Sequence, residues 1–77
     1  MRWQETRQAS VSPDEIVELR EQLGFSQAQL GRLLQLGTNT VSRWETGRKV
    51  QSASMDTLLR VLRDVPGTAE YLAKRVA

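Results

Sequence analysis

The segment that most constrains the fold of this chain is residues 26–47, which read SQAQLGRLLQLGTNTVSRWETG. Ser26 followed three residues later by Gln29 is a capping box, in which the serine oxygen accepts a hydrogen bond from a backbone N–H at a helix start and the glutamine reaches back to the cap. Leucines then recur at helical spacing, with Gly31 close beside them: Leu30, Leu33 and Leu34. The segment therefore predicts a short helix from about residue 27, against which a second helix can pack closely.

The second half of this segment predicts another short helix over about residues 38–46. At about 100° per residue, Val41 and Trp44 share one face of it. The opposite face carries hydrogen-bonding groups and one cation, and no hydrophobic side chain: Asn39, Ser42, Arg43 and Thr46. We therefore expect Val41 and Trp44 to be structural residues packed on the leucines, with the polar face turned outward.

A preceding helix is predicted between Ser12 and Gly24. Ser12 caps it, Pro13 suits its first position and Glu15 completes a second capping box, while Gly24 is a typical helix stop. Its core stripe is Ile16, Leu19 and Leu23. Residues 1–11 show no helical or strand pattern, so we expect an N-terminal tail that can be disordered on its own. Trp3 in that tail could dock on a partner subunit, lie along DNA or be loosely packed.

Two more helices are predicted after residue 47. Ser52 or Ser54 caps the first, and the second follows Pro66 and runs to about residue 76. Both carry apolar side chains beyond the number that one small core needs, among them Val61, Val65 and Tyr71. These side chains either form a homodimer interface or cover the core of a single chain. The whole pattern predicts an all-α, compact five-helix domain over residues 12–77.

Composition excludes several classes of function. The 77 residues allow only one small core. Because the chain has neither cysteine nor histidine, we expect no disulfide, no Cys/His metal site and no histidine acid–base catalysis. Carboxylates on the first helix are the sole support for an enzyme and are better explained by helix capping, so we expect no catalytic site and no cofactor. Apolar runs are short, which predicts a cytoplasmic protein of a bacterium or phage without a membrane-spanning segment.

The formal net charge of +2 is unevenly distributed. Residues 12–25 hold four acids against one arginine, a local net charge of −3, whereas residues 26–52 hold four cations against one acid, a local net charge of +3. The four cations are Arg32, Arg43, Arg48 and Lys49. A basic segment of this kind is typical of a protein that binds a phosphate backbone, although a solvated surface with a chance excess of charge is the alternative.

These residues resemble the Xre/Cro-type helix-turn-helix of phage repressors and toxin–antitoxin regulators. The resemblance covers about residues 12–64 and rests on Ser26-Gln27, a small residue at Gly31, Leu36 in the turn, and Thr40-Val41-Ser42-Arg43-Trp44-Glu45-x-Gly47. Within that family the chain looks most like the C-terminal domain of MqsA-type antitoxins, whose recognition helix also carries Asn and Arg four residues apart, here Asn39 and Arg43. The resemblance implies a repressor-like fold in which residues 38–46 form the recognition helix.

The outer face of this helix has chemistry suited to the DNA major groove. Asn39 offers a donor and an acceptor that match the edge of adenine, and Arg43 offers a two-pronged donor that matches guanine. The resemblance implies that these two residues read bases. Neighbouring polar and cationic side chains are expected to support them or to contact phosphates: Gln27, Thr38, Thr40, Ser42, Thr46, Arg48 and Lys49.

The family pattern also implies an ion pair between Arg20 and Glu45, with pairing of Arg20 to Glu18 or Glu21 of its own helix as the alternative. The chain departs from the family at Gln35, where glycine is common because the backbone there is left-handed. Either Gln35 adopts that conformation or the preceding helix runs on, and Gly37 is expected to absorb the turn.

Together these features predict a sequence-specific repressor that binds double-stranded DNA. We expect a homodimer that reads a palindromic operator and autoregulates a toxin–antitoxin operon, with a cognate toxin as a further partner. A Cro-like regulator of a phage or plasmid is an alternative, as is a protein-interaction module that uses the helix-turn-helix only as a scaffold.

Overall fold

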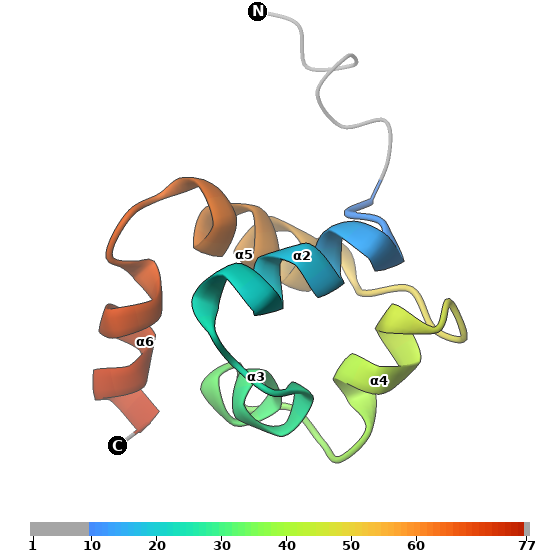
Figure 1. Cartoon of the computed structure of the whole chain (residues 1–77), viewed down its shortest axis with the longest axis horizontal. Coiled ribbons are helices and arrows are strands. Elements are labelled where there is room, and N and C mark those ends of the chain that lie inside the picture. The colour runs from blue at the N-terminus through green and yellow to red at the C-terminus, as the bar shows by residue number, and fades with distance from the viewer. Residues whose placement is uncertain (1–9, 77) are drawn as a thin grey trace, which may run out of the picture.

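Five helices build the part of the chain that the structure describes, residues 10–76 of a computed structural model (Figure 1). They are α2 (Pro13–Leu23), α3 (Gln27–Leu33), α4 (Thr40–Glu45), α5 (Ala53–Asp64) and α6 (Thr68–Val76), and these residues contain no strand. The predicted all-α, five-helix fold is confirmed. No helix among residues 10–76 is long and apolar enough to cross a lipid bilayer.

Local capping bonds define where three of the helices begin. Both bonds of the capping box are present at α2, where the Glu15 N–H donates to Ser12 Oγ at 3.2 Å and the Ser12 N–H donates to Glu15 Oε1 at 2.8 Å. The same pair of bonds joins Ser26 and Gln29 at the start of α3. Ser52, rather than Ser54, caps α5. These starts are encoded within four residues of sequence, which is why they were predictable.

The core is formed by side chains from α2, α3, α4 and α5, together with Val11 and Leu34. Its buried members are Val11, Ile16, Leu19, Leu30, Leu33, Leu34, Val41, Trp44, Leu59 and Leu62. Helix α4 packs on α2 and α3, and helix α6 packs on α3 and α5. Figure 1 shows α4 and α6 on opposite sides of α3. Burial of this apolar surface is the main force that holds the short helices together, because α3 and α4 are too short to be stable alone.

The turn between α3 and α4 differs from the prediction. Gln35 adopts the left-handed conformation with φ 58°, so the helix does not run on, and Asn39 is also left-handed with φ 71°. Gly37 is not among the residues with positive φ, so the expectation that it absorbs the turn is wrong. Because Asn39 is left-handed, α4 begins at Thr40, two residues later than the predicted start.

Val11 is part of the packed domain, although the sequence suggested that it belongs to the tail. Its side chain is buried, its N–H donates to Asp56 Oδ1 at 2.7 Å, and its carbonyl accepts from Gln51 Nε2 at 2.9 Å. Gln51, itself buried, also donates to Asp56 Oδ1 at 3.0 Å. This three-residue network ties the chain before α2 to the start of α5. Trp3 lies outside the described residues.

Candidate nucleic-acid interface

One face of α4 is buried and holds the helix in place. Val41 and Trp44 are each only 3% exposed, and both belong to the core that contains the leucines of α3. A methyl group added at Gly31 would lie 3.9 Å from Val41 Cγ2, which is ordinary van der Waals contact, so the two helices pack closely there without requiring glycine. The opposite face of α4 is consequently presented to solvent.

The two predicted base readers are both exposed, Arg43 within α4 and Asn39 at the residue before its first turn. Asn39 is exposed at the N-terminal end of α4 and its side chain makes no capping hydrogen bond. Arg43 is also exposed, and its guanidinium has no hydrogen bond or ion pair with any other side chain of residues 10–76. Both amide functions of Asn39 and the whole fork of Arg43 are therefore available to a ligand.

The supporting hydroxyl groups are not equivalent. Thr38 is exposed in the turn, and Thr40 and Ser42 are half-buried. Thr46 Oγ1 donates back to the carbonyls of Ser42 at 3.0 Å and Arg43 at 3.3 Å, so its hydroxyl proton is engaged by the helix end. Thr46 could therefore act toward a ligand only as an acceptor.

Cations follow α4 directly. Gly47 ends the helix with φ 77°, and the N–H groups of Arg48 and Lys49 donate to the carbonyl of Arg43 at 2.9 and 3.3 Å. This wraps the loop tightly around the end of α4. The side chains of Arg48 and Lys49 are exposed and unpaired within residues 10–76, so their charge is available to a nearby anion.

Glu45 joins α4 to two other elements through a group of contacts that we call the Glu45 network, formed by Arg20, Gln27, Glu45 and the Phe25 carbonyl. Arg20 Nε donates to Glu45 Oε2 at 2.7 Å, and Arg20 Nη2 donates to Glu45 Oε1 at 3.2 Å. Arg20 Nη1 also donates to the Phe25 carbonyl at 3.1 Å. Arg20 thus pairs across the fold with Glu45 rather than with Glu18 or Glu21, and the hydrogen bonds to Glu45 raise the pKa of Arg20 above its ordinary value.

Gln27 completes the Glu45 network in a way that the sequence did not indicate. Its Nε2 donates to Glu45 Oε1 at 2.8 Å, although the sequence suggested a phosphate contact for this residue. Gln27 remains exposed, so its second N–H and its carbonyl oxygen still face solvent. The amide is therefore held in one orientation at the start of α3.

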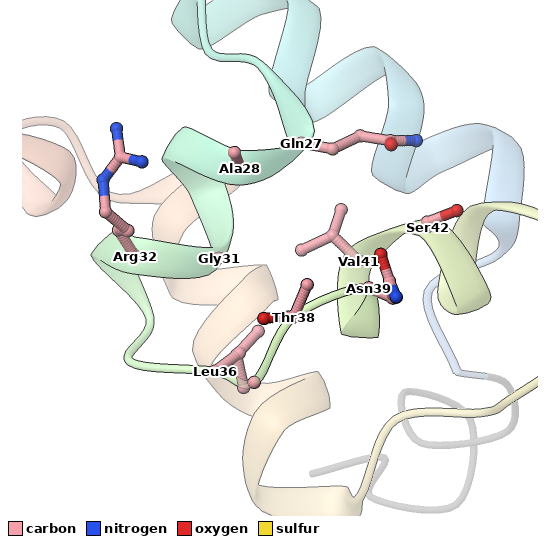
Figure 2. A pocket seen from close by; sticks show the side chains of 10 residues that line it. Gln27, Ala28, Gly31, Arg32, Leu36, Thr38, Asn39, Val41 and Ser42 are labelled. Atoms are coloured by element: carbon pink, nitrogen blue, oxygen red, sulfur yellow. The ribbon is translucent and has the colours of Figure 1, made fainter.

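A groove of about 310 Å³ runs between α3 and the start of α4 (Figure 2). It brings together several of the predicted residues: Gln27, Thr38, Asn39, Val41 and Ser42. Five residues that the sequence did not single out as contacts complete its lining: Ala28, Gly31, Arg32, Leu36 and Gly37. Thr40, Arg43, Thr46, Arg48 and Lys49 lie outside it. No group of three or more acidic side chains that could hold a metal ion occurs among residues 10–76.

Comparison with known proteins agrees with this geometry. The Helix-turn-helix family matches residues 16–72, which is most of the chain. The chain belongs to this family. Its two-helix unit corresponds here to α3 and α4, a motif that binds DNA by placing the second helix in the major groove.

The chain is also similar to a known antitoxin. Antitoxin HigA-2 of Vibrio cholerae serotype O1 (strain ATCC 39315 / El Tor Inaba N16961) is 38% identical over 65 residues, which cover 84% of this chain and 62% of that protein. The chain thus spans less than two thirds of the relative's length. This match supports likeness to an antitoxin, but it gives no support to the specific likeness to MqsA-type antitoxins.

Proposed function

We propose that this protein is a sequence-specific transcriptional repressor that binds double-stranded DNA through α4. The observation that carries the proposal is the open face of α4, where Asn39 and Arg43 present unused hydrogen-bonding groups while Val41 and Trp44 hold the opposite face in the core. A B-DNA major groove, about 12 Å wide, accepts one such helix. In this proposal Asn39 reads adenine and Arg43 reads guanine.

The residues around these two readers orient the protein on the duplex. Arg48 and Lys49 contact phosphates beside the groove, and Gln27 does so with the N–H that Glu45 leaves free. The hydroxyl groups of Thr38, Thr40 and Ser42 add contacts to bases or phosphates, whereas the Thr46 hydroxyl, whose proton is engaged by the end of α4, can only accept from a donor group on a base. None of these supporting contacts needs to distinguish one base from another.

A homodimer forms part of the proposal, because one short helix reaches only a few base pairs. Apolar side chains left exposed on α5, α6 and the loop between them support a second copy as the occupant of this surface: Val61, Val65, Tyr71 and Val76. We expect a symmetric pair of chains whose α4 helices are about 34 Å apart, reading a palindrome. A chain that sediments as a monomer, both free and on DNA, would contradict this part.

We further propose that the repressor is an antitoxin that acts in the cytoplasm and regulates its own operon. The similarity to Antitoxin HigA-2 supports this role and suggests a toxin as protein partner. Co-purification of the chain with the product of an adjacent gene tests it. A chain that binds its operator without any such partner would instead be a phage or plasmid regulator.

The central experiment is selection of bound duplexes from a random DNA pool, followed by binding measurements with Arg43→Ala. We expect the pool to converge on a palindrome, and the variant to keep its fold while losing about 1–3 kcal/mol of operator binding free energy with relaxed base preference at one position. Unchanged discrimination among single-base variants of the operator would contradict the assignment of Arg43. Trp44→Ala is unsuitable for this test, because it would damage the core.

A further inference from the structure

The unpaired cations of the domain lie on one side of the fold. The arginines of α2 and α5 are all paired with carboxylates: Arg20 with Glu45, Arg60 with Asp56 and Arg63 with Asp64. The other cationic side chains of residues 10–76 are exposed and form no hydrogen bond or ion pair there: Arg32, Arg43, Arg48, Lys49, Lys74 and Arg75. The first four of these belong to the helix-turn-helix and the loop after it. Lys74 and Arg75 lie in the last turn of α6, a helix that the proposed function uses only through its apolar side chains.

The C-terminal end of α6 lies beside the helix-turn-helix. Val76, next to Arg75 in the sequence, lines a hollow of about 590 Å³ together with Arg32, Gln35 and Leu36. Arg32 is in the last turn of α3, and Gln35 and Leu36 belong to the turn that leads to α4. Figure 1 shows α6 running from the level of α5 to the level of α3 and α4. The last turn of α6 is therefore on the side of the fold where the unpaired cations gather.

The charges of this last turn are not used within the domain. Cations in the last turn of a helix interact favourably with the negative end of the helix dipole, which explains why they occur there, but this engages none of their hydrogen-bond donors. Within the described part of the chain, Glu70, one turn before Lys74, forms no ion pair with it. No carboxylate of residues 10–76 lines the neighbouring hollow either. The Lys74 and Arg75 side chains are therefore available to an external anion.

The dimensions of the fold indicate which anion reaches this turn. Helix α4 has six residues and is about 9 Å long, whereas the fold is 37 Å along its longest axis, equal to about 11 base pairs of a duplex at about 3.4 Å each. Figure 1 shows α4 and α6 toward opposite ends of this axis. We propose that Lys74 and Arg75 bind phosphates of double-stranded DNA several base pairs away from the bases that α4 reads. This inference rests on the proposed function and extends its contact surface to the last helix.

The test compares the double variant Lys74→Gln/Arg75→Gln with Lys74→Arg/Arg75→Lys, which keeps both charges. The probe is a labelled duplex of mixed sequence that is longer than the fold, and its binding is measured by fluorescence anisotropy over a salt series. The loss of two phosphate contacts should lower the slope of log affinity against log salt by about 1.8 per bound chain. Raising salt from about 50 to 200 mM should then weaken the wild type about 12-fold more than the double-glutamine variant, per chain. The charge-retaining variant should keep the wild-type slope.

Arg63→Gln is the control, because it removes a charge from the exposed end of α5, on the side of the fold where the cations are paired. We expect it to leave the slope unchanged. Ethylation interference on the selected operator then locates the contact. In each half-site the wild type should show a sensitive phosphate that the double-glutamine variant lacks, several base pairs from the bases that α4 reads.

Four results would overturn this inference alone. They are an unchanged slope for the double-glutamine variant, an equal fall per charge for Arg63→Gln, the same interference pattern in variant and wild type, and an altered oligomeric state of the variant in sedimentation. The last of these would assign the end of α6 to the contact between two chains instead of to DNA. A wild-type chain that binds no duplex would overturn the proposed function together with this inference.

Discussion

Replacing Glu45 should loosen three segments of the fold at once, because its carboxylate accepts bonds from Arg20 and Gln27 while Arg20 also holds the Phe25 carbonyl. Removing one partner of a fully buried ion pair costs about 3–5 kcal/mol. The Glu45 side chain is 6% exposed, but the Arg20 side chain is 18% exposed and keeps its bond to Phe25. Water and that carbonyl therefore compensate part of the loss, and we expect Glu45→Ala to lower the free energy of unfolding by about 2–3 kcal/mol.

This loss is a large fraction of the stability of such a domain, which is roughly 4–10 kcal/mol for a chain of this length. It should lower the melting temperature by roughly 10–20 °C. Urea unfolding followed by circular dichroism measures the change. A double-mutant cycle with Arg20→Met and Glu45→Gln then isolates the pair, and we expect a coupling free energy above about 1 kcal/mol.

The exposed pair of Arg63 and Asp64 supplies the comparison within the same chain. Its side chains are 36% and 59% exposed, so water screens the attraction and its coupling should stay below about 0.5 kcal/mol. If the cycle on Arg20 and Glu45 gave a coupling no larger than this, the reasoning from burial would be refuted. The Glu45 network would then be a consequence of the fold and not a cause of its stability.

Three further perturbations test individual features. Gln35→Gly should raise the free energy of unfolding by about 0.5–1 kcal/mol, because the left-handed backbone at this exposed position favours glycine; a clear destabilisation in thermal melting would show that the side chain contributes a contact. Asn39→Gly should fold within about 0.5 kcal/mol of the wild type, since glycine accepts φ 71°, while operator affinity falls by about 1–3 kcal/mol; intact affinity would exclude Asn39 as a reader. Asp56→Asn tests the pH dependence of stability. Burial alone would raise the pKa of Asp56, but hydrogen bonds from Arg60, the Val11 N–H and Gln51 outweigh it and lower the pKa. A lowered native pKa stabilises the fold above the ordinary Asp range, and this contribution is lost as pH falls through the native pKa, so the variant should show a weaker acid dependence in urea titrations than the wild type.

Local patterns in the sequence were sufficient to predict the five helices and to tell the buried face of α4 from its exposed face. The capping boxes at Ser12 and Ser26 act over three residues, and the apolar spacing that buries Val41 and Trp44 acts over one helical turn. Such short-range patterns express the geometry of a single helix, so they can be read without knowing what the helix packs against. The exposure of Arg43 on the polar outer face of α4 followed from the same periodicity, whereas Asn39 lies before the helix in a left-handed conformation that the periodicity did not predict.

Contacts between distant residues were decided only by the tertiary structure. Gln27 bonds to Glu45 across 18 positions, and Val11 is held by Gln51 and Asp56 across 40 and 45 positions. No periodic pattern links such positions, because their meeting depends on how the helices pack and where the turns direct the chain. The left-handed Asn39 that delays the start of α4 is set by the same closure between α3 and α4.

Arg32 illustrates most clearly what the sequence determines and what only the tertiary structure determines. The sequence by itself counts it as one cation of a basic segment, equal to its neighbours. The packing of α3 against α4 places it beside the groove, while Arg20, Arg60 and Arg63 are paired with carboxylates. Charge is a property of the sequence, but the availability of that charge to a ligand depends on which partners the fold brings within reach.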